Sequence, residues 1–146
     1  MVTRRAKVKI RSMTEADLER IKDIDRALVG PDRVLSWPLT VEADWWLNRP
    51  MLNLVAETGD NVVGFLLGDI RGAEYGADTS GWIDMMGVAP EYQGRGIGRR
   101  LVKAFGEEYQ RNRVKVRVVV REDDERLIAF WTSVGFQRGN LVSYER

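Results

Sequence analysis

A glycine-rich turn between an apolar strand and an amphipathic helix constrains the fold of this chain more than any other feature. Residues 82–88 are mostly apolar and end at Ala89-Pro90, and the segment Gln93-Gly94-Arg95-Gly96-Ile97-Gly98 follows. Apolar residues then recur at helical i, i+4 spacing: they are Ile97, Leu101, Val102, Phe105 and Tyr109. A strand, a tight turn and a helix in this order predict a layered fold in which helices pack on a sheet.

The turn has the composition of an anion-binding site. The first turn of a helix leaves backbone N–H groups without internal partners, and the helix dipole adds partial positive charge there. Glycines let the backbone approach an anion closely, and Arg95, Arg99 and Arg100 add mobile positive charge. A dinucleotide fingerprint would need a glycine where Arg99 stands, and a Walker A loop would need Gly-Lys-Ser/Thr. Taken alone, the pattern also fits a purely structural strand-to-helix turn.

The remaining pattern predicts one domain over residues 1–146, without repeats or linkers. Strands are expected at 8–11, 52–57, 61–70, 82–88 and 114–120, with one or two short strands from Phe136 onward. Helices are expected at 14–28, where Thr14-Glu15-Ala16-Asp17 has the form of a capping box, and at 40–48, 97–109 and 123–135. The order of elements indicates a mixed α/β or α+β layer fold.

The absence of cysteine and histidine restricts the chemistry. It excludes disulfides, thiolate zinc sites and an acyl-cysteine intermediate. It also removes the commonest general base and metal ligand. We therefore expect no metal site, and acid–base work must fall to Asp, Glu, Tyr, Lys or water.

The charge balance points to no charged macromolecular partner. The chain has 23 Lys plus Arg against 22 Asp plus Glu, a net charge of +1. This gives no global electrostatic footprint for nucleic acid or a membrane surface. The sequence has no signal-peptide pattern and no apolar run of the roughly 18 residues that a membrane span needs. We expect a soluble cytoplasmic protein.

The segment from Met85 to Val102 resembles the signature of the GNAT superfamily of N-acetyltransferases. That signature is an apolar strand ending in Val-x-Pro, followed by Gln/Arg-x-x-Gly-x-Gly/Ala at the start of a helix. The N-terminal strand with Thr-x-x-Asp, and residues 126–136 with their Gly-Phe ending, are similar to the start and the last helix of the family. Residues 33–48 are the least similar part. The resemblance implies a mostly antiparallel, twisted sheet of about six to seven strands with a splayed central pair, flanked by about four helices.

The resemblance also implies acetyl-CoA as the co-substrate. In such enzymes the backbone amides of the glycine turn hold the pyrophosphate, and an exposed strand edge pairs with the pantetheine arm. An apolar strand rim with free backbone groups suits an amide-bearing arm. Carried over by position, the cofactor-binding residues are Met86, Gly87, Val88, Gln93, Gly94, Arg95, Gly96, Ile97, Gly98 and Arg99, with residues 114–120 as the splayed neighbour.

The implied reaction is direct transfer of an acetyl group to a primary amine, of a small molecule or a protein, in a ternary complex. It needs a neutral amine and a proton for the departing thiolate. The family often places the acid, a tyrosine, on the last helix, where this chain has Trp131, and an indole releases no proton at useful pH. The stripe position of Trp131 favours core packing. The candidate acids are then Tyr92, Tyr109, Tyr144 or water.

Asp84 is the candidate general base. On a regular strand it shares a face with Met86 and Val88, and a carboxylate inside an apolar run is unusual. The alternative is a structural carboxylate paired with an arginine or with backbone amides. Three weaker candidates stand at strand ends or in a loop: Glu57, Asp69 and Glu74.

The amine acceptor is not specified by the sequence. Tryptophans in the least family-like part either line an acceptor pocket or pack in the core: they are Trp37, Trp45 and Trp46. Acidic residues that would suit a cationic acceptor are Glu42, Asp44 and Glu74. Similar proteins are often dimers, so a homodimer is a candidate assembly. Two other hypotheses stay open: a catalytically degenerate acyl-CoA-binding or interaction module, which Trp131 favours, and a nucleotide-phosphate binder.

Overall fold

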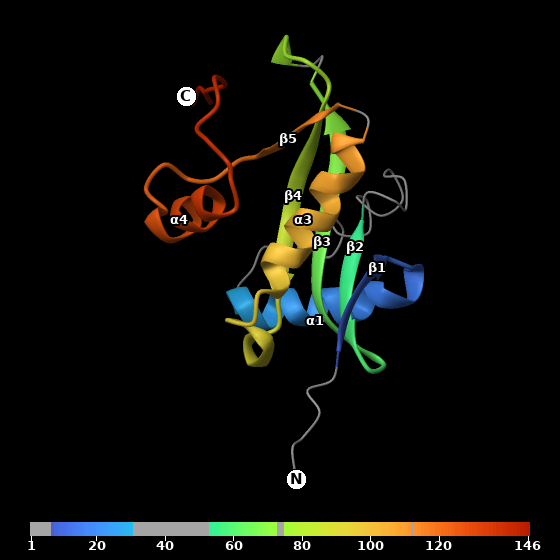
Figure 1. The fold of residues 1–146 in the computed structure, drawn as a ribbon. Helices are drawn as coiled ribbons and strands as arrows, with labels where there is room; N and C mark the ends of the chain where they lie inside the picture. The colour runs from blue at the N-terminus through green and yellow to red at the C-terminus, as the bar shows by residue number, and fades with distance from the viewer. Residues whose placement is uncertain (1–6, 31–52, 73–74, 112) are drawn as a thin grey trace.

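The apolar runs of the sequence form five strands of one sheet in the part of the chain that the structure, a computed structural model, describes: residues 7–30, 53–72, 75–111 and 113–146 (Figure 1). The strands are β1 (Val8–Ser12), β2 (Leu54–Thr58), β3 (Asn61–Arg71), β4 (Ser80–Val88) and β5 (Lys115–Val118). They lie in chain order; the first three pairings are antiparallel and β4 pairs with β5 in parallel.

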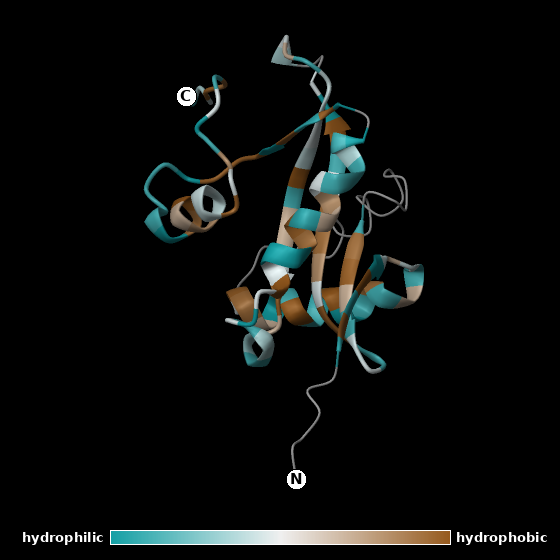
Figure 2. Ribbon diagram, viewed as in Figure 1, coloured by the Kyte–Doolittle hydropathy of each residue, from teal (hydrophilic) through white to brown (hydrophobic). Residues whose placement is uncertain are grey.

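Three α-helices of the described chain accompany the sheet: α1 (Leu18–Val29), α3 (Ile97–Gln110) and α4 (Glu125–Ser133). Side chains on successive strand residues point to opposite faces, so Ala56 and Leu66 pack under α3 while their neighbours Val55 and Phe65 pack with α1. Hydrophobic residues recur along the strands and alternate with hydrophilic ones along α1 and α3 (Figure 2). The predicted mixed α/β class with a mostly antiparallel sheet is confirmed.

Glycines on β3 and β4 let α3 seat closely on the sheet. A Cβ added to Gly68 would lie 2.3 Å from Cε2 of Phe105, and one added to Gly81 would lie 2.7 Å from the ring of Tyr109. Both ring-bearing residues are buried on α3. The helix therefore rests on backbone at these two points, and a side chain there would push it away.

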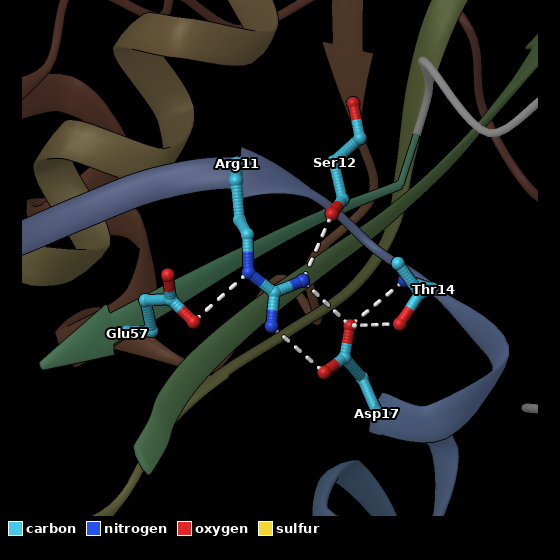
Figure 3. Close-up of polar contacts among 5 residues, drawn as sticks. All are labelled: Arg11, Ser12, Thr14, Asp17 and Glu57. Atoms are coloured by element: carbon cyan, nitrogen blue, oxygen red, sulfur yellow. Dashed lines mark hydrogen bonds and ion pairs between the residues drawn. The ribbon is translucent and has the colours of Figure 1, made fainter. Parts of the chain in front are cut away.

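An arginine network fixes the start of α1 against the sheet (Figure 3). Arg11 of β1 donates from Nη1 and Nη2 to the carboxylate of Asp17 at 2.8 and 2.9 Å, and from Nε to Glu57 of β2 at 2.9 Å. Asp17 also accepts from the backbone N–H of Thr14 at 2.8 Å, which completes the predicted capping box around a short 3-10 turn, η1 (Glu15–Asp17).

The network changes the protonation of both partners. Burial alone would raise the pKa of the Asp17 carboxyl, but the hydrogen bonds from Arg11 and Thr14 and the arginine charge hold that pKa below its ordinary value. The hydrogen bond to Asp17 raises the pKa of Arg11 against the opposing effect of its burial. These contacts have a structural role at this corner of the sheet. Glu57, a weaker candidate base, is part of them through its ion pair with Arg11.

The C-terminal strands were predicted wrongly. Residues 137–146 contain no strand, and the sheet of the described residues has five strands instead of the expected six to seven. The segment holds Gly139-Asn140, and its apolar residues Val142 and Tyr144 are 73% and 93% exposed, so it buries too little apolar surface to offset the entropy of ordering.

Part of the sequence lies outside the described residues. The helix expected at 40–48 lies there, and so do the tryptophans and acidic residues suggested for acceptor binding: Trp37, Trp45, Trp46, Glu42, Asp44 and Glu74. None of the helices that the structure describes is long and apolar enough to cross a membrane.

Candidate functional site

The glycine turn leads from β4 into α3 through backbone conformations that other residues rarely adopt. A 3-10 turn, η4 (Pro90–Tyr92), follows β4, and Gly94 and Gly96 then take φ values of 74° and 78°. Gly96 is the N-cap of α3. Left-handed conformations at two of three successive residues require glycine. They turn the chain so that the backbone N–H groups of the first helical turn point out of the helix end.

Space for an anion exists beside this turn. A Cβ on Gly94 or Gly96 would meet nothing within 4 Å. A Cβ on Gly98 would lie 3.7 Å from Met86 and from Phe130, in ordinary van der Waals contact, so α3 packs closely on β4 and α4 at this point. The backbone donors, the helix dipole and the open space beside Gly94 and Gly96 suit a phosphate group.

The strands β4 and β5 part in the middle of β4. Their pairing covers Ser80 to Ile83 opposite Lys115 to Val118, and no described strand pairs with that side of β4 after Ile83. Beyond this point β5 leads the chain away toward α4 (Figure 1). We call the parting point, between Ile83 and Asp84, the fork. Met86 and Val88 lie past the fork, on the strand edge that the sequence predicts for the pantetheine arm.

A hollow of about 1490 Å³ opens between α3, β5 and α4. Its lining includes Arg99 on α3, Val116 on β5, and Ile128 and Trp131 on α4. The hollow therefore reaches the first turn of α3 at Arg99 and runs beside β5, the splayed strand.

The arginines near the turn have different roles. Arg99 donates to the carbonyl oxygen and to Oγ of Ser133, both at 3.2 Å, and so ties α3 to α4. Arg95 lies over the ring of Tyr92 at 5.0 Å. Arg100 instead donates to the carbonyl oxygen of Val8 at 2.9 Å, on the β1 side, and is less available for an anion than the sequence suggested.

Asp84 lies on a β-bulge. In the pairing of β3 with β4, Leu67 faces Met85 and Gly68 faces Ile83, so Asp84 has no partner of its own. A bulge shifts the alternation of side chains by one residue. Ile83, Met86 and Val88 accordingly pack with the α3 core, and Met85 packs with the α1 core.

The expected shared face of Asp84 with Met86 and Val88 is therefore wrong. The Asp84 carboxylate forms an ion pair with Arg71 of β3, and the Arg71 guanidinium lies over the ring of Trp82, 5.8 Å from its centre. The Asp84 side chain is only 17% exposed. The sequence also allowed Asp84 to be a carboxylate paired with an arginine, and the structure has this pair. Asp84 is the first residue of β4 after the fork.

The three candidate tyrosines lie apart from one another. Tyr92 is half-buried in η4, next to the glycine turn. Tyr144 is almost fully exposed in the C-terminal segment. Tyr109 is buried on α3, its hydroxyl finds no hydrogen-bond partner among the described residues, and burial raises its pKa to about 12, with the charge of Asp69 acting in the same direction.

Trp131 is a core residue. It is 7% exposed and packs edge-on against Phe130 and Phe136, each with ring centres 5.0 Å apart. Asp124, which stands where the family often has asparagine, caps α4 by accepting from the backbone N–H of Leu127 at 3.0 Å. Both departures from the family pattern thus have a structural reason.

Arg71 and Ser133 were missed in the sequence. Arg71 belongs to no motif, and Ser133 lies in the family-like segment 126–136 without a predicted role; only the paired strands and the approach of α4 to α3 reveal their contacts. Asp69, a weaker candidate base, lies 3.6 Å from Nε of Arg71 and belongs to the same cluster. No group of three side chains able to hold a metal ion occurs in the described part of the chain.

Comparisons with known proteins find similarity to acetyltransferases. The family model described as "Acetyltransferase (GNAT) family" matches residues 18–136. The N-alpha-acetyltransferase RimI of Mycobacterium tuberculosis is 35% identical over 144 residues, covering 92% of this chain and 81% of that protein.

Solved structures share the fold. An aminoglycoside N-acetyltransferase in complex with CoA superposes with a TM-score of 0.79 at 18% identity, over 100% of this chain and 98% of that one. The ribosomal-protein-S18-alanine N-acetyltransferase from Escherichia coli gives a TM-score of 0.72 at 20% identity, over 92% of this chain and 80% of that one.

Proposed function

Because this chain belongs to the acetyltransferase (GNAT) family, we propose that it transfers the acetyl group of acetyl-CoA directly to the α-amine of a protein or peptide in a ternary complex. Family membership makes it an N-acetyltransferase, and we propose the acceptor and the direct transfer in a ternary complex. An α-amine is favoured because the N-alpha-acetyltransferase of Mycobacterium tuberculosis is similar over 92% of this chain. A small-molecule amine is the alternative acceptor.

The continuity between the glycine turn and the splayed edge of β4 carries the proposal. The backbone N–H groups from Gly94 to Arg99 would hold the pyrophosphate, and the free edge at Met86 and Val88 would pair with the pantetheine amides. The two are adjacent, since a Cβ on Gly98 would lie within 3.9 Å of both Met86 and Val88. A cofactor laid along this path would bring its thioester to the fork, where Asp84 stands.

The chemistry at the fork is an acyl transfer. The amine nitrogen forms a bond to the acetyl carbon while the bond from that carbon to sulfur breaks, and coenzyme A leaves as a thiolate. An alkylammonium must first lose its proton to become a nucleophile. We assign this proton to the Asp84 carboxylate, directly or through one water.

We propose that water protonates the thiolate. Tyr92 lies in η4, beyond the end of β4, and Val88 at that end is about 15 Å from the fork at the rise of a strand. Tyr109 holds its proton tightly in a buried site, and Tyr144 lies exposed in the C-terminal segment. Phenylalanine variants at the three positions should each keep kcat within about threefold, since a positioned acid would contribute 10²-fold or more.

The test is turnover on a panel of amines. The purified chain is incubated with acetyl-CoA and a peptide with a free α-amine, the same peptide with that amine blocked, and an aminoglycoside; thiol release and peptide mass are followed. We expect one acetyl group on the free α-amine. Asp84→Asn should lower kcat about 100-fold or more, and Asp60→Asn, which removes an exposed carboxylate from the turn between β2 and β3, is the matched control.

A non-catalytic acyl-CoA-binding module is the second candidate. The observation in its favour is Trp131, which packs in the core at the position of the usual acid. Calorimetric binding of coenzyme A without turnover on any amine would support it and contradict our proposal. Tighter binding of ATP than of coenzyme A would contradict both.

A further inference from the structure

Arg71, the last residue of β3, makes several contacts around Asp84 but has no role in the reaction as proposed above. It pairs with Asp84, lies 3.6 Å by Nε from the carboxylate of Asp69, and stands over the Trp82 ring. One guanidinium thus contacts two carboxylates and one aromatic face, all from β3 and β4. Its side chain is 30% exposed, so it is partly shielded from water.

The contact between Arg71 and Asp84 spans an unusual distance along the strands. Arg71 faces Ser80 in the β3–β4 pairing, and Asp84 lies four residues further along β4. Those residues correspond to about 10–13 Å of strand. The arginine must therefore extend along β4, over the Trp82 ring, to reach the carboxylate at the bulge. The ring acts as a platform that limits where the guanidinium can go.

We infer that Arg71 is a positioning residue, which holds the Asp84 carboxylate at the fork in the orientation that receives the proton of the acceptor amine. The inference rests on the proposed function. Asp84 sits on a bulge, where the strand ladder does not fix it. The contact runs from Nη2 of Arg71 to Oδ1 of Asp84, and we assign the proton to Oδ2.

The chemistry of arginine suits this role. Guanidinium stays charged at all pH values that proteins tolerate, and its planar group stacks on an aromatic ring while it binds a carboxylate. A lysine would supply the charge but neither the planar fork nor the stacking. Misplacing a catalytic group by about 1 Å can cost 10²-fold in rate, so the orientation of Asp84 should be visible in kcat.

Arg117 provides a matched control. It lies on β5 with its guanidinium 6.0 Å from the centre of the same Trp82 ring, and it donates to Oγ of Ser80 at 3.2 Å. It makes no described contact with Asp84. Replacing Arg117 removes a similar charge from the same ring and leaves the ion pair between Arg71 and Asp84 in place.

The experiment is a double-mutant cycle on the intact chain. Four variants are compared with the wild type: Arg71→Met, Asp84→Asn, the double variant and Arg117→Met. We expect Arg71→Met to lower kcat by between about 10- and 100-fold, with the KM for acetyl-CoA changed less than about twofold. If Arg71 acts through Asp84, the double variant should be no slower than Asp84→Asn alone. Arg117→Met should stay within about threefold of the wild type.

Several outcomes would overturn the inference. Multiplication of the two single effects in the double variant would mean that Arg71 acts independently of Asp84. An unchanged kcat in Arg71→Met would show that Arg71 does not position Asp84. An unchanged kcat in Asp84→Asn would show that Asp84 does not accept the proton. Arg71→Lys should recover part of kcat, and it replaces the methionine variant if that variant does not fold, as judged by circular dichroism and coenzyme A binding. Absence of turnover in the wild type is the separate failure of the proposed function.

Discussion

Arg99 on the first turn of α3 donates hydrogen bonds to both the carbonyl oxygen and Oγ of Ser133 on the last turn of α4. Arg99 and Ser133 both line the hollow between α3, β5 and α4, so this contact joins two of its walls. One side chain contributes positive charge near the anion site and also fixes the opposite wall. Cofactor binding should therefore depend on Arg99 for two reasons.

Arg99→Met should weaken coenzyme A binding about five- to tenfold, because hydrogen bonds of this kind contribute about 1 kcal/mol. Calorimetric titration with coenzyme A measures the change. Arg100→Met is the control, since Arg100 bonds to β1 instead of α4. We expect its effect to stay below twofold, and equal effects of the two variants would show that only net charge matters.

Gly96→Ala should destabilise the protein by about 1–2 kcal/mol, because an L-residue is strained at the φ of 78° found there. Urea unfolding measures the free energy. Gly106→Ala is the matched control in the same helix: its Cβ would meet nothing within 4 Å, so it should stabilise by up to about 1 kcal/mol. A neutral Gly96→Ala would argue against the left-handed cap.

Gly68→Ala should destabilise by about 1–3 kcal/mol through overpacking against Phe105. Combining it with Phe105→Leu should cost less than the sum of the two single changes, because the smaller side chain leaves room for the methyl group. Thermal and urea unfolding of the three variants give the comparison. Strict additivity would show that the contact is not the cause.

Asp17→Asn should lower the free energy of unfolding at pH 7 by about 2 kcal/mol, because it breaks charge-assisted hydrogen bonds to Arg11 and Thr14. The pKa of Asp17 is lower in the folded state than its ordinary value of 3.8. Its contribution is therefore fully present well above pH 3.8 and disappears as the pH falls through the folded-state pKa. The difference between wild type and variant, measured by unfolding at several pH values, should shrink below about pH 4. A constant difference would exclude this linkage.

The elements with strong local signals were predictable from the sequence. Alternating or continuous apolar runs marked β3 and β4, the capping box marked the start of α1, and the stripe ending at Tyr109 marked α3. The position of the glycine turn between β4 and α3 is confirmed. These signals depend on neighbours close in the chain, which is why a single sequence contains them.

The bulge at Asp84 could not be predicted. Ile83, Met85 and Met86 are all apolar, so the pattern around Asp84 fits either register and either face. The choice depends on β3 and on Arg71, which are distant in the sequence. The prediction of a strand after Phe136 was wrong for the same reason, because a strand needs a partner strand and the local composition does not specify one.

Because α3 packs closely on the sheet, a displacement of one end of this helix is transmitted to its other end. Tyr109 rests on Gly81 near one end, Phe105 rests on Gly68, and the other end, about 20 Å away at the rise of a helix, carries the anion-binding turn. A bulkier residue at Gly81 would push Tyr109 away from the sheet, tilt α3 and displace its N-terminus at the glycine turn. The affinity for the cofactor can thus be retuned from a site that the cofactor never touches, without any change in the glycine turn itself.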